Sequence, residues 1–267
     1  MLQPHSFLWH YLWLGPHVLQ AVLAVLLWRR GIHRQFPFFF AYLVYEASEE
    51  ITLWTMDVVP LSWVSALAWW RAFFAGAAIE ELLKLAVIWE LLAHFVRPRP
   101  AEAKLGKRLI SSTGAVLVML AVLAAHYTPM VHWQLMLISY AHVFLMAAYI
   151  VLSGLMLVLF LFAAYRKMTW DWRALGIALG FAIVWCEHLA TWSLTAHGLA
   201  AGRAYLLDFL NMGTYHVCVL IWFYYLLSPA RASAAVANAP AVSKTTGDEH
   251  DGTSDWRLRW AWLLSKS

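Results

Sequence analysis

Three glutamates in one apolar stretch are the most unusual chemical feature of the sequence. Glu46, Glu49 and Glu50 lie inside the apolar run 36–58, and at about 100° per residue of an α-helix they share one face. With a rise of about 1.5 Å per residue, they lie near the middle of a hydrocarbon layer about 30 Å thick. Carboxyl groups held together at that depth can share a proton or bind a cation.

Other ionisable side chains occur at similar depth in other apolar runs. The i,i+3 and i,i+4 spacings of Glu80, Glu81 and Lys84 favour an ion pair within one helix. Glu187 and His188 lie near the centre of a later run, and His216 lies in the last one. The candidate residues for binding a ligand or an ion are therefore Glu46, Glu49, Glu50, Glu80, Glu81, Lys84, Glu187, His188 and His216.

These carboxylates exceed the positive charge available to them. A charged residue at the centre of a membrane helix costs about 2.5–3.5 kcal/mol, and Lys84 is the only lysine or arginine in the candidate set. The excess charge must be protonated, hydrated or matched by a bound cation. A divalent metal ion is one possible cofactor, and no catalytic residue is assigned. The candidate metal ligands are Glu46, Glu50, Glu187, His188 and His216.

The composition indicates which elements position these groups. Of 267 residues, 63% are hydrophobic and 13% are charged, which is typical of an integral membrane protein. Each of seven runs approaches or exceeds the roughly 20 residues that cross a bilayer. We therefore predict an all-α, polytopic bundle of about seven transmembrane helices, near 6–28, 36–58, 64–95, 109–127, 134–163, 174–197 and 205–227.

The distribution of lysine and arginine predicts the orientation. Sixteen of the 19 lie in connections or in the tail on one side of the predicted membrane, whereas only Arg203 lies on the other. Because positive charge is enriched in cytoplasmic loops, the N-terminus is expected outside and the C-terminus in the cytoplasm. The expected location is the plasma membrane, which is the inner membrane in a Gram-negative bacterium.

The chain divides into a predicted transmembrane domain, 1–228, and a cytoplasmic tail, 229–267. The tail begins as a polar, flexible linker. In its last part, 256–267, tryptophan and leucine recur at helical spacing, which predicts a short helix at the membrane surface. Glu90 and His94, near the expected cytoplasmic end of their run, predict a polar network there.

A sensor or receptor is the first functional hypothesis. Seven helices with an external N-terminus resemble, in topology, bacterial seven-helix sensory input modules. Such a bundle would bind a small ligand, a proton or a metal ion in a mid-membrane cavity lined by carboxylates and histidines. Because the sequence shows no kinase or cyclase pattern, the signal would pass to a separate cytoplasmic partner protein. The other expected partner is the lipid bilayer, and no nucleic acid is expected to bind.

Two alternative functions stay open. An intramembrane metal-dependent hydrolase is similar in outline to the alkaline ceramidase superfamily, which implies a zinc site with paired histidines on the last helix. Here the last run has His216 but no second histidine four residues away. A proton- or cation-coupled transporter also suits protonatable carboxylates at mid-membrane depth, although no inverted repeat is evident.

Overall fold

All the elements in the described part of the chain are helices. The computed structural model describes residues 6–59, 65–96, 100–127, 136–167, 171–196 and 204–228, so the predicted tail, 229–267, lies outside the described residues. Each of the seven predicted runs corresponds to one helix, and a short 3₁₀ helix, η1, follows the first. The helices are α1 (Phe7–Arg29), η1 (Ile32–Arg34), α2 (Pro37–Val58), α3 (Ala66–Val96), α4 (Pro100–Tyr127), α5 (Met136–Tyr165), α6 (Trp172–Ala196) and α7 (Ala204–Leu227).

Four of these helices are long and apolar enough to cross a membrane. They contain the stretches Phe7–Arg29, Val143–Tyr165, Trp172–Thr191 and Tyr205–Leu227, which indicates a membrane protein. Helices α2 and α3, which carry glutamates 46, 49, 50, 80 and 81, are not among these four, and neither is α4. Helix α4 begins about nine residues earlier than predicted, because a polar first segment continues the helix beyond its apolar run.

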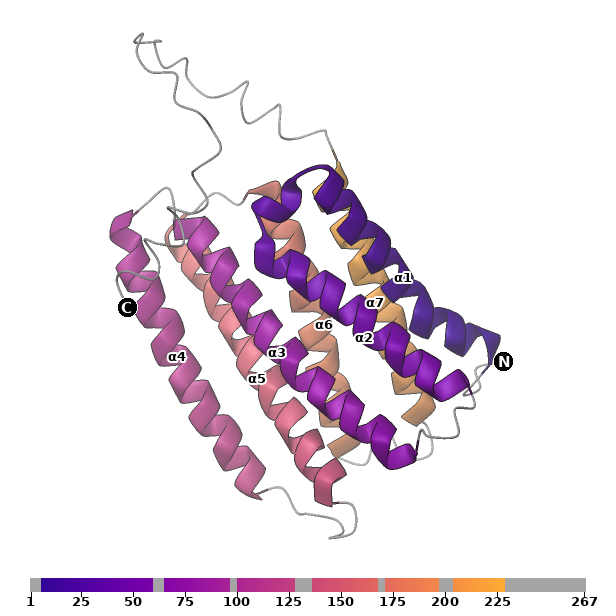
Figure 1. Ribbon diagram of the computed structural model, residues 1–267. Helices are drawn as coiled ribbons and strands as arrows, with labels where there is room; N and C mark the ends of the chain where they lie inside the picture. The colour runs from indigo at the N-terminus through magenta and orange to yellow at the C-terminus, as the bar shows by residue number, and fades with distance from the viewer. Residues whose placement is uncertain are drawn as a thin grey trace. The chain divides into compact units, whose positions relative to one another are not determined.

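Six helices form a closed ring, and the seventh lies outside it. Around the ring, each helix packs on the next in the order α1, α2, α3, α5, α6, α7 and back to α1. Helix α4 packs mainly on α5 and more weakly on α3, and Figure 1 shows it at the edge of the bundle. The carboxylate-bearing helices α2 and α3 are therefore neighbours within the ring.

The half of the ring that contains the α1–α2 turn is filled by aromatic side chains. We call this the closed half. Phe39, Phe181, Trp185 and Trp222 are each at most 1% exposed, and Phe39 meets Phe181 and Trp222 edge to face, with ring centroids 6.1 and 5.3 Å apart. Such close packing leaves little room for water or a ligand.

A polar network at the end of the closed half ties α3 to two neighbours. The Glu90 carboxylate accepts hydrogen bonds of 3.0 Å from the backbone N–H groups of Phe38 and Phe39. It thereby satisfies donors that the first turn of α2 leaves without a partner. His94 Nε2 lies 3.5 Å from Asp171 Oδ2 just before α6, and this interaction holds the pKa of Asp171 below its usual value.

Glycines let α6 and α7 approach each other closely. A Cβ atom built on Gly180 would overlap the Trp222 ring, and one on Gly176 would overlap the Tyr225 side chain. These glycines are four residues apart and lie on the same face of α6, as in the small-residue motifs that bring membrane helices together. The fully buried Trp222 therefore depends on the absence of a side chain at Gly180.

The outer surface of the bundle is apolar. Val18, Val22 and Val25 on α1 are between 45 and 52% exposed, and Leu157 and Leu161 on α5 are each 59% exposed. Extended apolar surface of this kind requires an apolar environment. The bundle thus combines this apolar outer surface with buried acidic groups such as Glu46, Glu81 and Glu90, as expected for a protein in lipid.

Substitution at Gly180 tests the α6–α7 contact. We expect Gly180→Ala to lower the free energy of unfolding by about 1–3 kcal/mol, because the added methyl group forces Trp222 from its position. Gly213→Ala in α7 is the matched control, since its added Cβ would meet nothing within 4 Å. Thermal unfolding of the purified variants in detergent measures both. Equal melting temperatures for the two variants would show that the Gly180 contact does not matter for stability.

Candidate functional site

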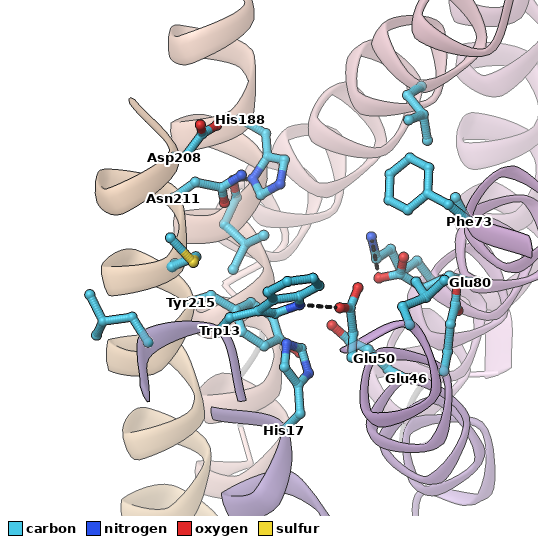
Figure 2. Close-up of a pocket in the computed structure, with 18 of the residues that line it drawn as sticks. Trp13, His17, Glu46, Glu50, Phe73, Glu80, His188, Asp208, Asn211 and Tyr215 are labelled. Carbon is cyan, nitrogen blue, oxygen red and sulfur yellow. Dashed lines mark hydrogen bonds and ion pairs between the residues drawn. The ribbon is translucent and has the colours of Figure 1, made fainter. Parts of the chain in front are cut away.

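The other half of the ring, in which α1 begins, encloses a cavity of about 390 Å³. All six ring helices contribute to its wall, and α4 contributes no residue. Figure 2 shows labelled side chains from α1, α2, α3, α6 and α7 around the cavity. The exposed residue Asp208, near the start of α7, belongs to the lining, so the cavity reaches the surface in this half.

The structure brings together most of the residues that the sequence analysis selected. The cavity is lined by six of them: Glu46, Glu49, Glu50, Glu80, Lys84 and His188. Glu81, Glu187 and His216 do not belong to the lining. These side chains converge because, in the closed ring, the polar faces of α2 and α3 are turned toward α6 and α7.

Lys84 is already paired with two carboxylates. Its Nζ atom lies 2.8 Å from Glu80 Oε1 and 2.8 Å from Glu81 Oε1. The Lys84 side chain is only 6% exposed, and Nζ also lies 5.8 Å from the centroid of the Tyr149 ring. The predicted ion pair is therefore present, and this lysine contacts neither Glu46, Glu49 nor Glu50 through a salt bridge within the described residues.

A buried glutamine joins three helices at the bottom of the cavity. Gln20 on α1 is 0% exposed, and its Nε2 donates to Glu46 Oε2 at 3.1 Å and to the Tyr215 hydroxyl. Its Oε1 lies 3.0 Å from His17 Nδ1, which acts as the donor in the tautomer that satisfies both groups. Tyr215 in turn exchanges a hydrogen bond with Tyr42, with the hydroxyl oxygens 3.1 Å apart.

Gln20 was not identified from the sequence. A single glutamine in an apolar run carries no charge and forms no motif, so its only signal is that an amide at this depth requires hydrogen-bond partners. The structure shows that its partner Glu46 comes from another helix. Gln20 thus provides a neutral hydrogen-bond donor to the buried carboxyl group of Glu46.

Glu50 and Glu49 differ in their hydrogen bonds. Trp13 on α1 donates its indole Nε1–H to Glu50 Oε2 at 2.8 Å, a contact drawn in Figure 2. Glu49 packs on Gly76 of α3, where a Cβ atom would overlap Glu49 Oε1. Its Oε2 is buried and has no hydrogen-bond partner in the described structure. Glu49 therefore differs from Glu50 in having one buried carboxyl oxygen without a donor in the described part of the chain.

The five proposed metal ligands do not converge. Glu46 and Glu50 accept from Gln20 and Trp13, as described above. His188 Nδ1 lies 3.1 Å from Glu187 Oε2 and 2.9 Å from the backbone oxygen of Val184. The ring of His216 packs against Tyr11, with centroids 5.9 Å apart. Among the described residues, no three His, Cys, Asp or Glu side chains are grouped closely enough to hold a metal ion.

The lining of the cavity combines two kinds of side chain. Carboxyl groups come from α2 and α3, with Asp208 of α7 nearer the surface. Aromatic rings come from α1 and α3 among others, and Trp69 and Phe73 are stacked with centroids 5.5 Å apart and an interplanar angle of 5°. A site with this lining can hold a molecule that has both an apolar body and a group complementary to carboxylates.

Replacing Gln20 tests the hydrogen-bond network. We expect Gln20→Leu to destabilise the protein by about 1–3 kcal/mol, because Glu46 then lacks its donor in a buried place. Adding Glu46→Gln to that variant should recover part of the loss, since the unpartnered carboxyl group is removed. A double-mutant cycle of melting temperatures in detergent measures the coupling. Strictly additive effects would mean that Gln20 and Glu46 act independently.

Comparison with known proteins assigns no family. No protein-family model matches the chain, no curated protein is similar to it, and no solved structure matches its fold. The functional interpretation therefore depends on the cavity and its residues.

Proposed function

We propose that the protein is a receptor-type membrane protein that binds a small ligand in the ring cavity and passes the signal to a separate cytoplasmic partner. The observation that carries this proposal is a cavity that reaches the surface in one half of the ring while Phe39, Phe181 and Trp222 fill the other. A binding site that reaches the surface in this half of the ring suits recognition of a ligand from one side of a membrane.

The proposal includes seven membrane-spanning helices with the cavity facing the exterior. Glutamates 46, 49 and 50 of α2 and glutamate 80 of α3 line the cavity, whereas Ile79, Leu82 and Leu85 on another face of α3 are exposed. This arrangement supports placing both helices in lipid in spite of their charges. The bias of lysine and arginine toward the closed half supports a cytoplasmic position for that half, in the plasma membrane.

Each of the two alternative functions requires an additional structural feature of the bundle. A transporter must open its site toward the closed half as well, which requires the aromatic cluster of Phe39, Phe181 and Trp222 to separate. A metal-dependent hydrolase needs converging ligands around one ion, whereas its candidate ligands are not grouped around one point among the described residues. The geometry therefore favours the receptor over both alternatives.

Cysteine accessibility tests the single opening. In a background with Cys186→Ser and Cys218→Ser, we expect Asn211→Cys in the cavity wall to react with a membrane-impermeant thiol reagent added outside, but not with reagent added inside. Leu23→Cys is the control for a buried position in the closed half and should react from neither side. Reaction of Asn211→Cys from both sides would favour the transporter, and reaction from neither would refute an open cavity.

Reporter fusions test the predicted orientation separately. A reporter joined after Ser228 should be active only in the form that functions in the cytoplasm, and one joined before Leu8 only in the form that functions outside. The physical reason is the retention of positively charged connections on the cytoplasmic side. Activity of both fusions on the same side would exclude an odd number of spanning helices.

A further inference from the structure

We infer that the ligand is a small organic cation, a primary ammonium group attached to an apolar body. Its charged group would lie against Glu49 and Glu50, and its body would lie among the aromatic rings of the same lining. This inference rests on the proposed function, since it names the chemistry of a molecule that the cavity binds.

The charges of the wall favour a cation. Glu46, Glu49, Glu50, Glu80 and Asp208 line the cavity, and among the lining residues that the structure describes, Lys84 is the only lysine or arginine. Lys84 is held by Glu80 and Glu81 at 2.8 Å each, so its charge is already matched. An ammonium group entering the cavity would therefore meet carboxyl groups with no competing cation beside them.

The hydrogen bonds that the lining already makes favour a ligand with N–H donors. Glu50 receives a neutral indole N–H, and Glu49 Oε2 is buried without any donor in the described part of the chain. A primary ammonium group has three N–H donors and can bridge two carboxyl groups. A quaternary ammonium has no N–H donor and could not form such a bridge.

The aromatic side chains make a second contribution to recognition of the ligand, in addition to that of the carboxyl groups. Trp13 lies beside Glu50, as Figure 2 shows, so a cation at that carboxylate also lies close to the indole ring. The stacked rings of Trp69 and Phe73 offer an apolar surface in the same cavity. Aromatic rings next to carboxylates attract ammonium groups through both the ring quadrupole and the negative charge.

The same chemistry excludes two related cations. A divalent metal ion prefers several converging oxygen ligands, whereas the described residues contain no such group. The ammonium of an aminophospholipid headgroup is close to a phosphate, which Glu80 and Asp208 in the wall would repel. The volume of about 390 Å³ is near the lower end of small-molecule sites, which span roughly 300–1,000 Å³.

Thermal unfolding of the full-length protein in detergent tests the ligand class. We expect phenethylamine at neutral pH to raise the melting temperature in a concentration-dependent way, because it binds only the folded state. Its neutral isostere 2-phenylethanol and the zwitterionic probe O-phosphoethanolamine should have much smaller effects. No shift with phenethylamine, or an equal shift with 2-phenylethanol, would overturn the inference.

Variants locate the binding site. Glu49→Gln and Glu50→Gln should each weaken phenethylamine binding roughly tenfold or more, as expected for a lost hydrogen bond to a charged group. Phe73→Leu should weaken it several-fold through the lost ring. Asp57→Asn is the matched control, an exposed acidic residue on α2 outside the cavity lining, and should retain wild-type affinity. Unchanged affinity in both glutamine variants would place the amine elsewhere.

A protection experiment separates this inference from the proposed function. Phenethylamine should slow the external labelling of Asn211→Cys several-fold, while 2-phenylethanol should not. If the cysteine is labelled only from outside but the amine neither protects it nor raises the melting temperature, the cavity is open and the ligand class is wrong. If external reagent never reaches the cysteine, the receptor proposal itself fails.

Discussion

The cost of burying carboxyl groups is the constraint on which the rest of the structure depends. An acidic side chain removed from water needs a cation, a hydrogen-bond donor or a proton, and each must come from a neighbouring group at the same depth. Lys84 pairs with Glu80 and Glu81 within α3, whereas Gln20 and Trp13 of α1 donate to Glu46 and Glu50 of the neighbouring α2. The polar interactions therefore fix the relative positions of α1, α2 and α7, in addition to the apolar packing.

Dense packing in the closed half holds the helices in position around the cavity in the other half of the ring. Gly180 allows Trp222 to reach a fully buried position against α6, and Trp222 then contacts Phe39 and Phe181 across the ring. Glu90 fixes the start of α2 with two hydrogen bonds to its backbone. A helix whose first turn is held in this way presents its next turns, including Tyr42 and Glu46, at a defined position in the cavity.

A ligand in such a cavity would act on several helices at once. The wall contains residues from every helix of the ring, and Glu49 fits between α2 and α3 only because Gly76 has no side chain. Glu49 packs on α3 and Glu50 accepts from α1. A cation bound to both carboxyl groups would therefore favour one spacing of α2 relative to α1 and α3. A ligand shifts an equilibrium only through different affinities for two states, and these contacts between helices are where such a difference would arise.

The sequence by itself determined the helices, their approximate limits and the acidic residues near the middle of α2 and α3, because apolar run length and charge position are local properties. It also predicted the Lys84 ion pair, whose members lie within one turn of α3. Only the tertiary structure decided that Gln20 donates to Glu46, that Trp13 donates to Glu50, and that Glu81, Glu187 and His216 do not line the cavity. The physical reason is that these outcomes depend on which helices are neighbours and how each is rotated, and a single sequence with no repeat or family motif contains no local signal for either.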